Sequence, residues 1–165
     1  MSNRDFDDFY REVRSSCLQA LYVTVSDLHE AEDLLAEAFT RAFKSWSDVR
    51  NHPAPSAWVV RTALNLHTDN WRKKRYGRSR QHLVAVGQIH EDKITMVDPS
   101  LLQSLKALPE QQLQVVIHRV LLDLSTQQTS QILGISEGTV SVHLKRGLAS
   151  IRELLRQQEE QEYTK

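Results

Sequence analysis

Residues 121–155 constrain the fold of this 165-residue chain more than any other segment, because they read as two helices joined by a turn at Gly134. Ser125 and Gln128 have the spacing of a capping box at the start of the first helix, and Ser136 is placed to cap the second. Glycine adopts positive φ at little cost, which suits a tight turn. The pattern predicts a helix-turn-helix, whose second helix enters a DNA major groove.

The rest of the chain is also predicted to be helical. Glycine and proline number only five and four, and helix-forming residues dominate. We therefore predict an all-α fold of two small helical domains, residues 1–76 and 100–165, joined by a flexible linker over residues 77–99. The C-terminal domain contains the helix-turn-helix.

Apolar residues recur at helical spacing in the N-terminal domain. This spacing predicts helices over residues 3–24, 28–46 and about 55–76, with a loop at residues 47–56. Asp27 and Glu30 have capping-box spacing before the second helix. Phe39 and Phe43 are predicted to lie on the flank of that helix, and the three tryptophans Trp46, Trp58 and Trp71 are predicted to be core residues rather than base-stacking platforms.

In the C-terminal domain, a short leucine-rich helix is followed by Pro109, which we predict to be the first residue of the next helix. The buried face of that helix is predicted to contain Leu113, Val116, Ile117, Val120, Leu121 and Leu124. The last helix is predicted to be held inward by Val140, Leu144, Leu148 and Ile151. Residues 157–165 are predicted to be a polar, frayed tail.

The net charge of zero conceals an uneven distribution. Residues 1–50 carry six basic and ten acidic side chains, whereas residues 51–82 carry seven basic and one acidic. Phosphates respond to the local basic band rather than to the total charge. We therefore expect residues 51–82, which include the run Trp71 to Arg75, to bind nucleic acid, and the acidic N-terminal part to face a protein.

Several other classes of protein are disfavoured. The single cysteine, Cys17, excludes an internal disulfide and a cysteine-based zinc site, and its place on the apolar stripe indicates a buried thiol. No histidine pair has helical ligand spacing and there is no glycine-rich phosphate loop, so we expect no metal, no cofactor and no catalytic residues. No apolar run approaches membrane-spanning length, and no signal peptide is recognised, so we expect a cytoplasmic protein without membrane insertion.

Beyond these patterns, the chain resembles the extracytoplasmic-function (ECF) group of bacterial RNA polymerase sigma factors over residues 5–76 and 100–155. The resemblance is carried by Ala31–Phe39, by Trp58, Arg61, Ala63, Asn65, Leu66, Asp69 and Arg72, and by Leu105–Pro109 and Ile132–Val140. It implies a sigma-2-like domain at residues 1–76, for polymerase docking and melting of the −10 element. It also implies a sigma-4-like domain at residues 100–165 that recognises the −35 element.

The resemblance and the residue types together suggest three sets of site residues. The set for the −10 element is Asn51, His52, Arg61, Asn65, Asp69, Arg72, Lys73, Lys74 and Arg75, with Arg78 and Arg80 as further phosphate contacts. The set for the −35 element is Ser136, Glu137, Thr139, Ser141, Val142, His143, Lys145 and Arg146. The set for the clamp of core RNA polymerase is Asp33, Glu37, Thr40, Arg41 and Lys44. Core polymerase, promoter DNA and an anti-sigma factor are the partners that the resemblance implies.

The chain departs from the family pattern in three places. Ala36 replaces a glutamine that is usual on the clamp-facing helix, and Gln128–Ser130 replaces Glu-Ile-Ala. This second change puts polar Thr129 where an apolar residue is expected. Ser141 and His143 stand where lysine and arginine are common, so the recognition helix has up to two fewer positive charges.

Three alternatives to a sigma factor remain open from the sequence. A helix-turn-helix regulator of the LuxR type fits Thr139–Leu144 but leaves residues 1–76 unexplained. A protein-interaction module without promoter activity fits the weakened basic helix. A metal-dependent helical hydrolase has little support.

Overall fold

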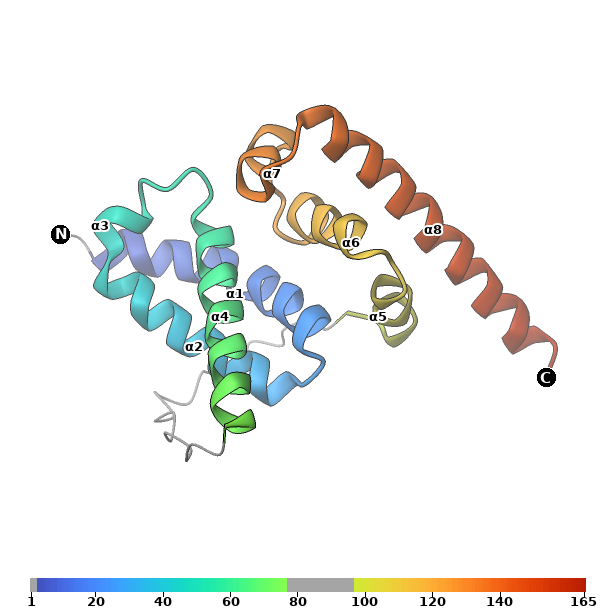
Figure 1. Cartoon of the computed structure of the whole chain (residues 1–165), viewed down its shortest axis with the longest axis horizontal. Coiled ribbons are helices and arrows are strands. Elements are labelled where there is room, and N and C mark those ends of the chain that lie inside the picture. The colour runs from blue at the N-terminus through green and yellow to red at the C-terminus, as the bar shows by residue number, and fades with distance from the viewer. Residues whose placement is uncertain (1–2, 77–96) are drawn as a thin grey trace. The chain divides into compact units, whose positions relative to one another are not determined.

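The computed structural model describes residues 3–76 and 97–165, which form helices and short connections without a strand (Figure 1). The chain divides into two compact units, residues 1–95 and 96–165. The all-α prediction is confirmed. Most of the predicted linker, including Arg78 and Arg80, lies outside the described residues.

Unit 1 is built from α1 (Asn3–Val25), α2 (Leu28–Lys44), α3 (Trp46–Val49) and α4 (Pro55–Arg75). The three long helices pack against one another. The core of unit 1 includes Leu18, Leu21, Leu34, Val49 and Val59, which are almost fully buried. Cys17 is also buried there, and burial raises the pKa of its thiol to about 12. At neutral pH this thiol is protonated and therefore a poor nucleophile.

The start of α2 differs from the predicted capping box. The Asp27 side chain accepts a hydrogen bond from the Glu30 backbone N–H at 2.9 Å, as expected. The Glu30 carboxylate instead lies 2.7 Å from Nδ1 of His67, on α4. This contact links α2 to α4, so a residue expected to serve a local cap serves tertiary packing.

The predicted loop at residues 47–56 is wrong in its first part, because α3 occupies Trp46–Val49. α2 ends two residues earlier than predicted, and Trp46 packs against Phe6 and Phe9 with ring centroids 5.3 and 4.9 Å apart. Phe39 is buried in the core rather than on a flank, whereas Phe43 is exposed. This aromatic cluster supports a short helix that the sequence period alone did not indicate.

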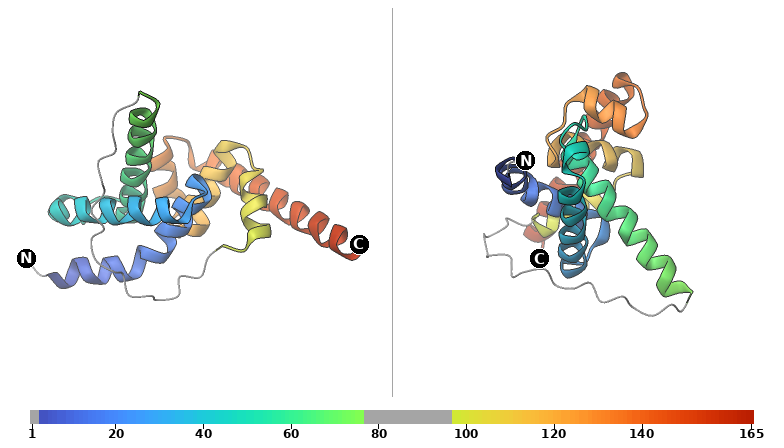
Figure 2. Two further views of the ribbon diagram at one scale, coloured as in Figure 1. Left: turned by 90° about the horizontal axis from the view of Figure 1, so that it is seen from below. Right: turned by 90° about the vertical axis from the view of Figure 1, so that its left-hand side faces the viewer.

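α4 begins as predicted, with Pro55 in its first turn, where a missing backbone N–H costs nothing. Val59, Val60 and Ala63 are buried, whereas residues 71–76 are all exposed. Figure 2 shows the C-terminal end of α4 projecting beyond the other helices of unit 1. The basic run therefore lies on a part of the helix that has little of unit 1 packed around it.

Unit 2 contains α5 (Pro99–Lys106), α6 (Glu110–Val116), a π-helix η1 (Ile117–Leu121), α7 (Thr126–Leu133) and α8 (Glu137–Tyr163). α5, α6 and α7 each pack against α8. Pro109 is the N-cap of α6 rather than its first residue, with ψ of 144°, and its carbonyl accepts from the Leu113 N–H at 2.9 Å.

The π-helix changes which residues are buried after α6. The Leu122 N–H donates to the Ile117 carbonyl at 3.0 Å, five residues back, so this turn contains one residue more than an α-helical turn. The residues that face the core therefore differ from those predicted for a regular α-helix. Val120, predicted to be buried, is 52% exposed, whereas His118 and Leu122 are buried.

α8 is a single continuous helix to Tyr163, so the predicted frayed tail is wrong (Figure 1). Arg156 pairs with Glu153 at 2.7 Å and with Glu160, and pairs at these spacings favour a helix. Val140 and Ile151 are buried as predicted, and Leu144 and Leu148 are half-buried. Within residues 3–76 and 97–165, no helix has the length and apolar character needed to cross a membrane.

Candidate nucleic-acid interface

The polar stripe of α4 is presented to solvent. Arg61, Asn65, Asp69 and Arg72 are all exposed, and each follows the previous one by three or four residues. Residues at this spacing share one face of a helix. Since Val59, Val60 and Ala63 hold the opposite face in the core, the orientation of the stripe is fixed by the packing of α4.

The four basic residues that end α4, Arg72 to Arg75, are exposed as well. Within the described residues, no carboxylate lies at ion-pair distance from any of them. Cations in the last turn also complement the negative end of the helix dipole. The result is a cluster of four positive charges without an ion-pair partner in the described part of the chain, and such a cluster attracts polyanions such as DNA.

Trp71 is the clearest departure from the sequence prediction in this region. It was predicted to be a core residue, but its side chain is 55% exposed. The guanidinium carbon of Arg75 lies 5.4 Å from the centre of its ring. Trp46 and Trp58, by contrast, are half-buried. Trp71 lies in the last turns of α4, where residues 71–76 are all exposed.

The loop before α4 holds Asn51 and His52 in defined orientations. The Asn51 side-chain amide donates to the Ser47 carbonyl at 2.8 Å, and Nδ1 of His52 accepts from the Ala54 N–H at 3.0 Å. With Nδ1 as acceptor, the neutral imidazole carries its proton on Nε2. Asn51 therefore retains a free carbonyl oxygen and His52 an N–H donor, which are the groups needed to contact the edge of a base.

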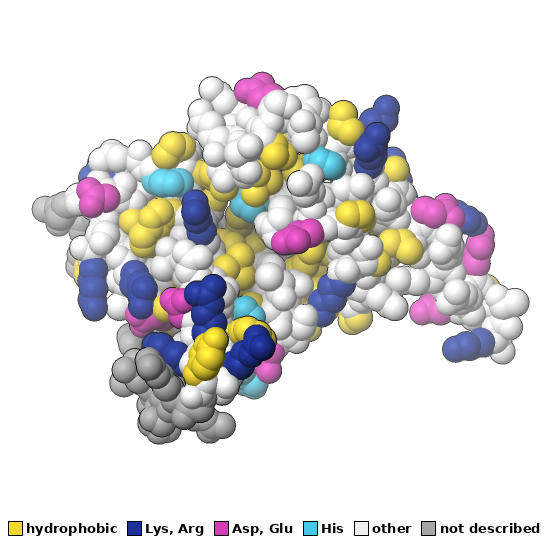
Figure 3. Space-filling model, viewed as in Figure 1, with side chains coloured by type: hydrophobic (Ala, Val, Ile, Leu, Met, Phe, Trp, Pro, Cys, Tyr) yellow, Lys and Arg dark blue, Asp and Glu magenta, His cyan; other side chains and the backbone are white. Residues whose placement is uncertain are grey.

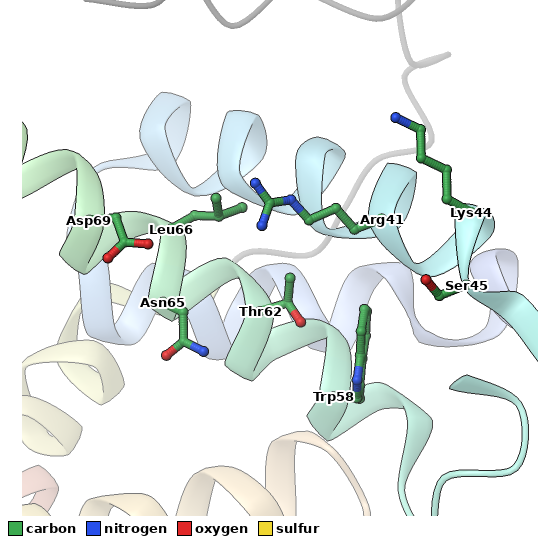
Figure 4. Close-up of a pocket in the computed structure, with 8 residues that line it drawn as sticks. All are labelled: Arg41, Lys44, Ser45, Trp58, Thr62, Asn65, Leu66 and Asp69. Carbon is green, nitrogen blue, oxygen red and sulfur yellow. The ribbon is translucent and has the colours of Figure 1, made fainter. Parts of the chain in front are cut away.

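An open groove of about 400 Å³ lies between α2 and α4 (Figure 4). It is lined by Arg41, Lys44, Ser45, Trp58, Thr62, Asn65, Leu66 and Asp69. The structure thus brings together two predicted sets, since Arg41 and Lys44 were assigned to polymerase while Asn65 and Asp69 were assigned to DNA. Trp58 and Thr62 were not among the predicted site residues, and only the crossing of α2 and α4 places them here.

The remaining polymerase-set residues lie on α2. Asp33 is exposed, and Glu37 accepts from Nε of Arg41 at 3.1 Å, one helical turn away. The Thr40 hydroxyl donates to the Ala36 carbonyl at 2.9 Å, so its own helix already uses its proton. This face therefore presents a carboxylate, an Arg–Glu pair and Lys44.

The helix-turn-helix has the local geometry that its sequence predicted. Ser125 and Gln128 form a reciprocal capping box, and Gly134 has φ of +67°. The Ser136 hydroxyl accepts from the Thr139 N–H at 3.1 Å and caps α8. The Ser130 hydroxyl donates to the Ile135 carbonyl at 2.6 Å, which ties α7 to the turn.

Most of the predicted −35 set is accessible on α8. Ser136, Glu137, Ser141, Val142, Lys145 and Arg146 are exposed, whereas Thr139 and His143 are half-buried. Val142, an apolar residue, is 46% exposed. Apolar side chains at such positions can meet a thymine methyl group, and Lys or Arg can contact guanine or phosphate. Thr139 also shares a hydrogen bond of 2.8 Å with Ser136, so these two hydroxyls are partly engaged in the cap.

Two family models match this chain. The model described as sigma-70 region 2 matches residues 5–76, and the model described as sigma-70, region 4 matches residues 99–151. The chain is 29% identical over 152 residues to the RNA polymerase sigma-E factor of Streptomyces avermitilis, covering 92% of this chain and 85% of that protein. It is 29% identical over 167 residues to the ECF RNA polymerase sigma factor SigW of Bacillus subtilis, with 92% and 88% covered.

A solved structure shares the fold. It is the complex of the sigma factor RpoE with the anti-sigma factor NepR from Bartonella quintana, which matches with a TM-score of 0.66 and 19% sequence identity. The match covers 93% of this chain and 98% of that chain.

Proposed function

Since the chain belongs to the ECF group of RNA polymerase sigma factors, we propose that it binds core RNA polymerase and directs initiation through the −10 and −35 promoter elements. The observation that carries this proposal is the presence of sigma-70 regions 2 and 4 in order on one chain. Sigma factors are initiation factors rather than enzymes. We place this one in the cytoplasm, where polymerase and chromosome are found.

The exposed end of α4 and the Asn51–His52 loop are proposed to engage the −10 element. Opening a promoter needs no bond chemistry from the protein, only a surface that binds the separated strand more tightly than the duplex. Arg72 to Arg75 would hold phosphates, and the free groups of Asn51, His52 and Asn65 would meet base edges. Arg61 and Asp69 complete the proposed set.

The N-terminal half of α8 is proposed to read the −35 element. Lys145 and Arg146 would contact phosphate or guanine, Val142 a thymine methyl, and Glu137 a cytosine amino group. Ser136, Thr139, Ser141 and His143 border these contacts. Because serine and histidine occupy positions 141 and 143, this helix would bind DNA with fewer positive charges than is usual in the family.

The α2 surface made by Asp33, Glu37, Thr40, Arg41 and Lys44 is proposed to dock on the polymerase clamp. An anti-sigma factor is a further proposed partner, since the RpoE relative of matching fold was solved with the anti-sigma factor NepR. The LuxR-type alternative is not favoured, because it gives no role to residues 5–76, which match region 2.

Run-off transcription with core polymerase on a promoter library tests the proposal. The full chain should form a holoenzyme and give transcripts from a subset of templates that core polymerase alone does not use. A chain that neither binds core polymerase nor initiates on any template would reject it. Binding to DNA alone, with no effect on polymerase, would instead support the regulator.

A further inference from the structure

Trp71 is a large apolar side chain in an unusual setting. Trp71 is 55% exposed, and the residues that follow it are Arg72, Lys73, Lys74 and Arg75. Contact between water and an apolar surface of this size is unfavourable. A ligand that covers the ring would therefore gain binding free energy. Neither the polymerase set nor the −10 set contains this residue.

The neighbours of Trp71 on the helix surface show what could cover it. Arg75 lies four residues after Trp71, with its guanidinium over the ring at 5.4 Å, and Thr68 lies three residues before. Arg72 is in turn one helical turn from Thr68 and from Arg75. Trp71 therefore borders the polar stripe of α4 at its most positive end. Figure 3 shows Lys and Arg side chains gathered around apolar surface at this end of α4.

The positive charge of this site favours binding of a polyanion. The flat tryptophan ring favours a chemical group that can stack on it through a π-face. An unpaired base offers both faces of its ring system, whereas bases inside a duplex are already stacked on their neighbours. Base–aromatic stacking beside basic side chains is the usual way in which proteins hold single strands. Arginine stacked on an aromatic ring adds to the same platform.

We propose that the Trp71 ring stacks on an unpaired DNA base whose flanking phosphates are held by Arg72 and Arg75. This stacking position lies at the C-terminal end of α4 and outside the groove that Trp58 lines. The inference rests on the proposed function and extends it, since it adds a base-binding position to the −10 surface. It also gives a role to an exposed tryptophan that directly precedes a run of four cations.

Binding of the full chain to short DNA tests the stacking itself. The probes are a single-stranded oligonucleotide of mixed sequence and a hairpin duplex with the same number of phosphates. Trp71→Ala should weaken single-strand binding about tenfold and leave duplex binding nearly unchanged. Its salt dependence should keep the wild-type slope because no charge is lost, whereas Arg72→Gln should reduce that slope.

Fluorescence provides an independent readout. Stacked bases quench tryptophan emission, so the single strand should quench the fluorescence of the wild type more than that of Trp71→Phe. The remaining fluorescence of Trp71→Phe comes from the partly buried Trp46 and Trp58. Tyr163→Ala is the matched control, since Tyr163 is an exposed aromatic residue (93%) in an acidic part of α8. Thermal unfolding should be unchanged in Trp71→Ala, because the ring packs little against the core.

The outcomes separate this inference from the proposed function. The inference is wrong if the wild type binds no single strand, if Trp71→Ala binds it as tightly as the wild type, or if single strand and duplex lose equal affinity. A holoenzyme with Trp71→Ala that opens promoters at the wild-type rate also overturns it, while the proposed function stands. If the wild-type chain never initiates with core polymerase, the proposed function itself fails.

Discussion

A Cβ atom added to Gly147 would lie 2.9 Å from Cγ2 of Val116, so α8 packs against α6 at this point because residue 147 has no side chain. Gly147→Ala should therefore destabilise unit 2. Alanine gains about 1 kcal/mol in helix propensity, but overpacking a core typically costs about 1–3 kcal/mol. We expect a net loss of about 1 kcal/mol, measured by urea unfolding of the full chain.

Gly138→Ala is the matched control for that change. An added Cβ there would meet only Ser136 Oγ at 3.9 Å, so alanine should be neutral or slightly stabilising. Equal stability for both variants would contradict the close packing of α6 and α8.

Thr129 is fully buried on α7 and its hydroxyl has no hydrogen-bond partner among the described residues. Thr129→Val keeps the shape and removes the unsatisfied hydroxyl, so it should stabilise the protein by about 1–2 kcal/mol. Thr129→Ser keeps the hydroxyl and removes a methyl group, so it should be less stable than the wild type. Both are measured by chemical unfolding; a destabilised valine variant would show that the hydroxyl has a partner in solution.

Burial lowers the pKa of His118 below its ordinary value of 6.5, and the hydrogen bond to the Gln114 carbonyl opposes this in part. The folded state then binds the proton less well than the unfolded state. The stability that the neutral imidazole provides is complete above pH 6.5 and decreases as the pH falls below it. We expect His118→Gln to show a weaker loss of stability on acidification, and identical pH profiles would exclude this role.

Reversing the four charges at Arg72 to Arg75 should impair promoter opening more than polymerase binding, because these side chains lie at the exposed end of α4 rather than on the α2 surface that we propose docks on the clamp. Permanganate footprinting of the holoenzyme measures the opened bases, and co-purification measures polymerase binding. A second variant with neutral glutamines at the same four positions removes the positive charge without adding acidic side chains, which could destabilise the helix. Arg11→Glu and Lys106→Glu, which reverse exposed cations elsewhere in the chain, are the controls, and unchanged bubble reactivity in the α4 variant would count against the assignment.

Lys145→Ala should weaken binding to −35 DNA and reduce the salt slope by about one if the ammonium contacts a phosphate. Arg146→Ala should in addition relax base preference if the guanidinium contacts a guanine. Lys106→Ala, an exposed lysine on α5, is the control. Both are measured by titration of holoenzyme on promoter fragments at several salt concentrations; slopes equal to that of the control would remove Lys145 from the interface.

The sequence predicted the features that depend on a few neighbouring residues. The capping box of Ser125 and Gln128, the αL turn at Gly134 and the Ser136 cap were all identified correctly, since each depends on groups within one or two turns. The long helices of unit 1 also followed from apolar periodicity. The resemblance to sigma factors could also be recognised from the sequence, because family motifs are local in sequence. The two family models confirmed it.

The errors arose where a tertiary contact or a change of helix type overrides the local pattern. Glu30 was expected to close a local cap but contacts His67, and Val120 was expected in the core but is turned outward by a π-helical turn. Helical periodicity assumes a constant rotation per residue, so an added residue in one turn changes every face that follows.

The sequence by itself determined where the long helices of unit 1 run, how α7 and α8 are capped and where positive charge collects, because hydrogen bonding and charge along a helix act over short range. Only the tertiary structure decided that Trp71 is exposed and that Arg41 lines a groove with Asn65. Whether a side chain is buried depends on which other helices pack against it, and those helices are formed by residues distant in the chain.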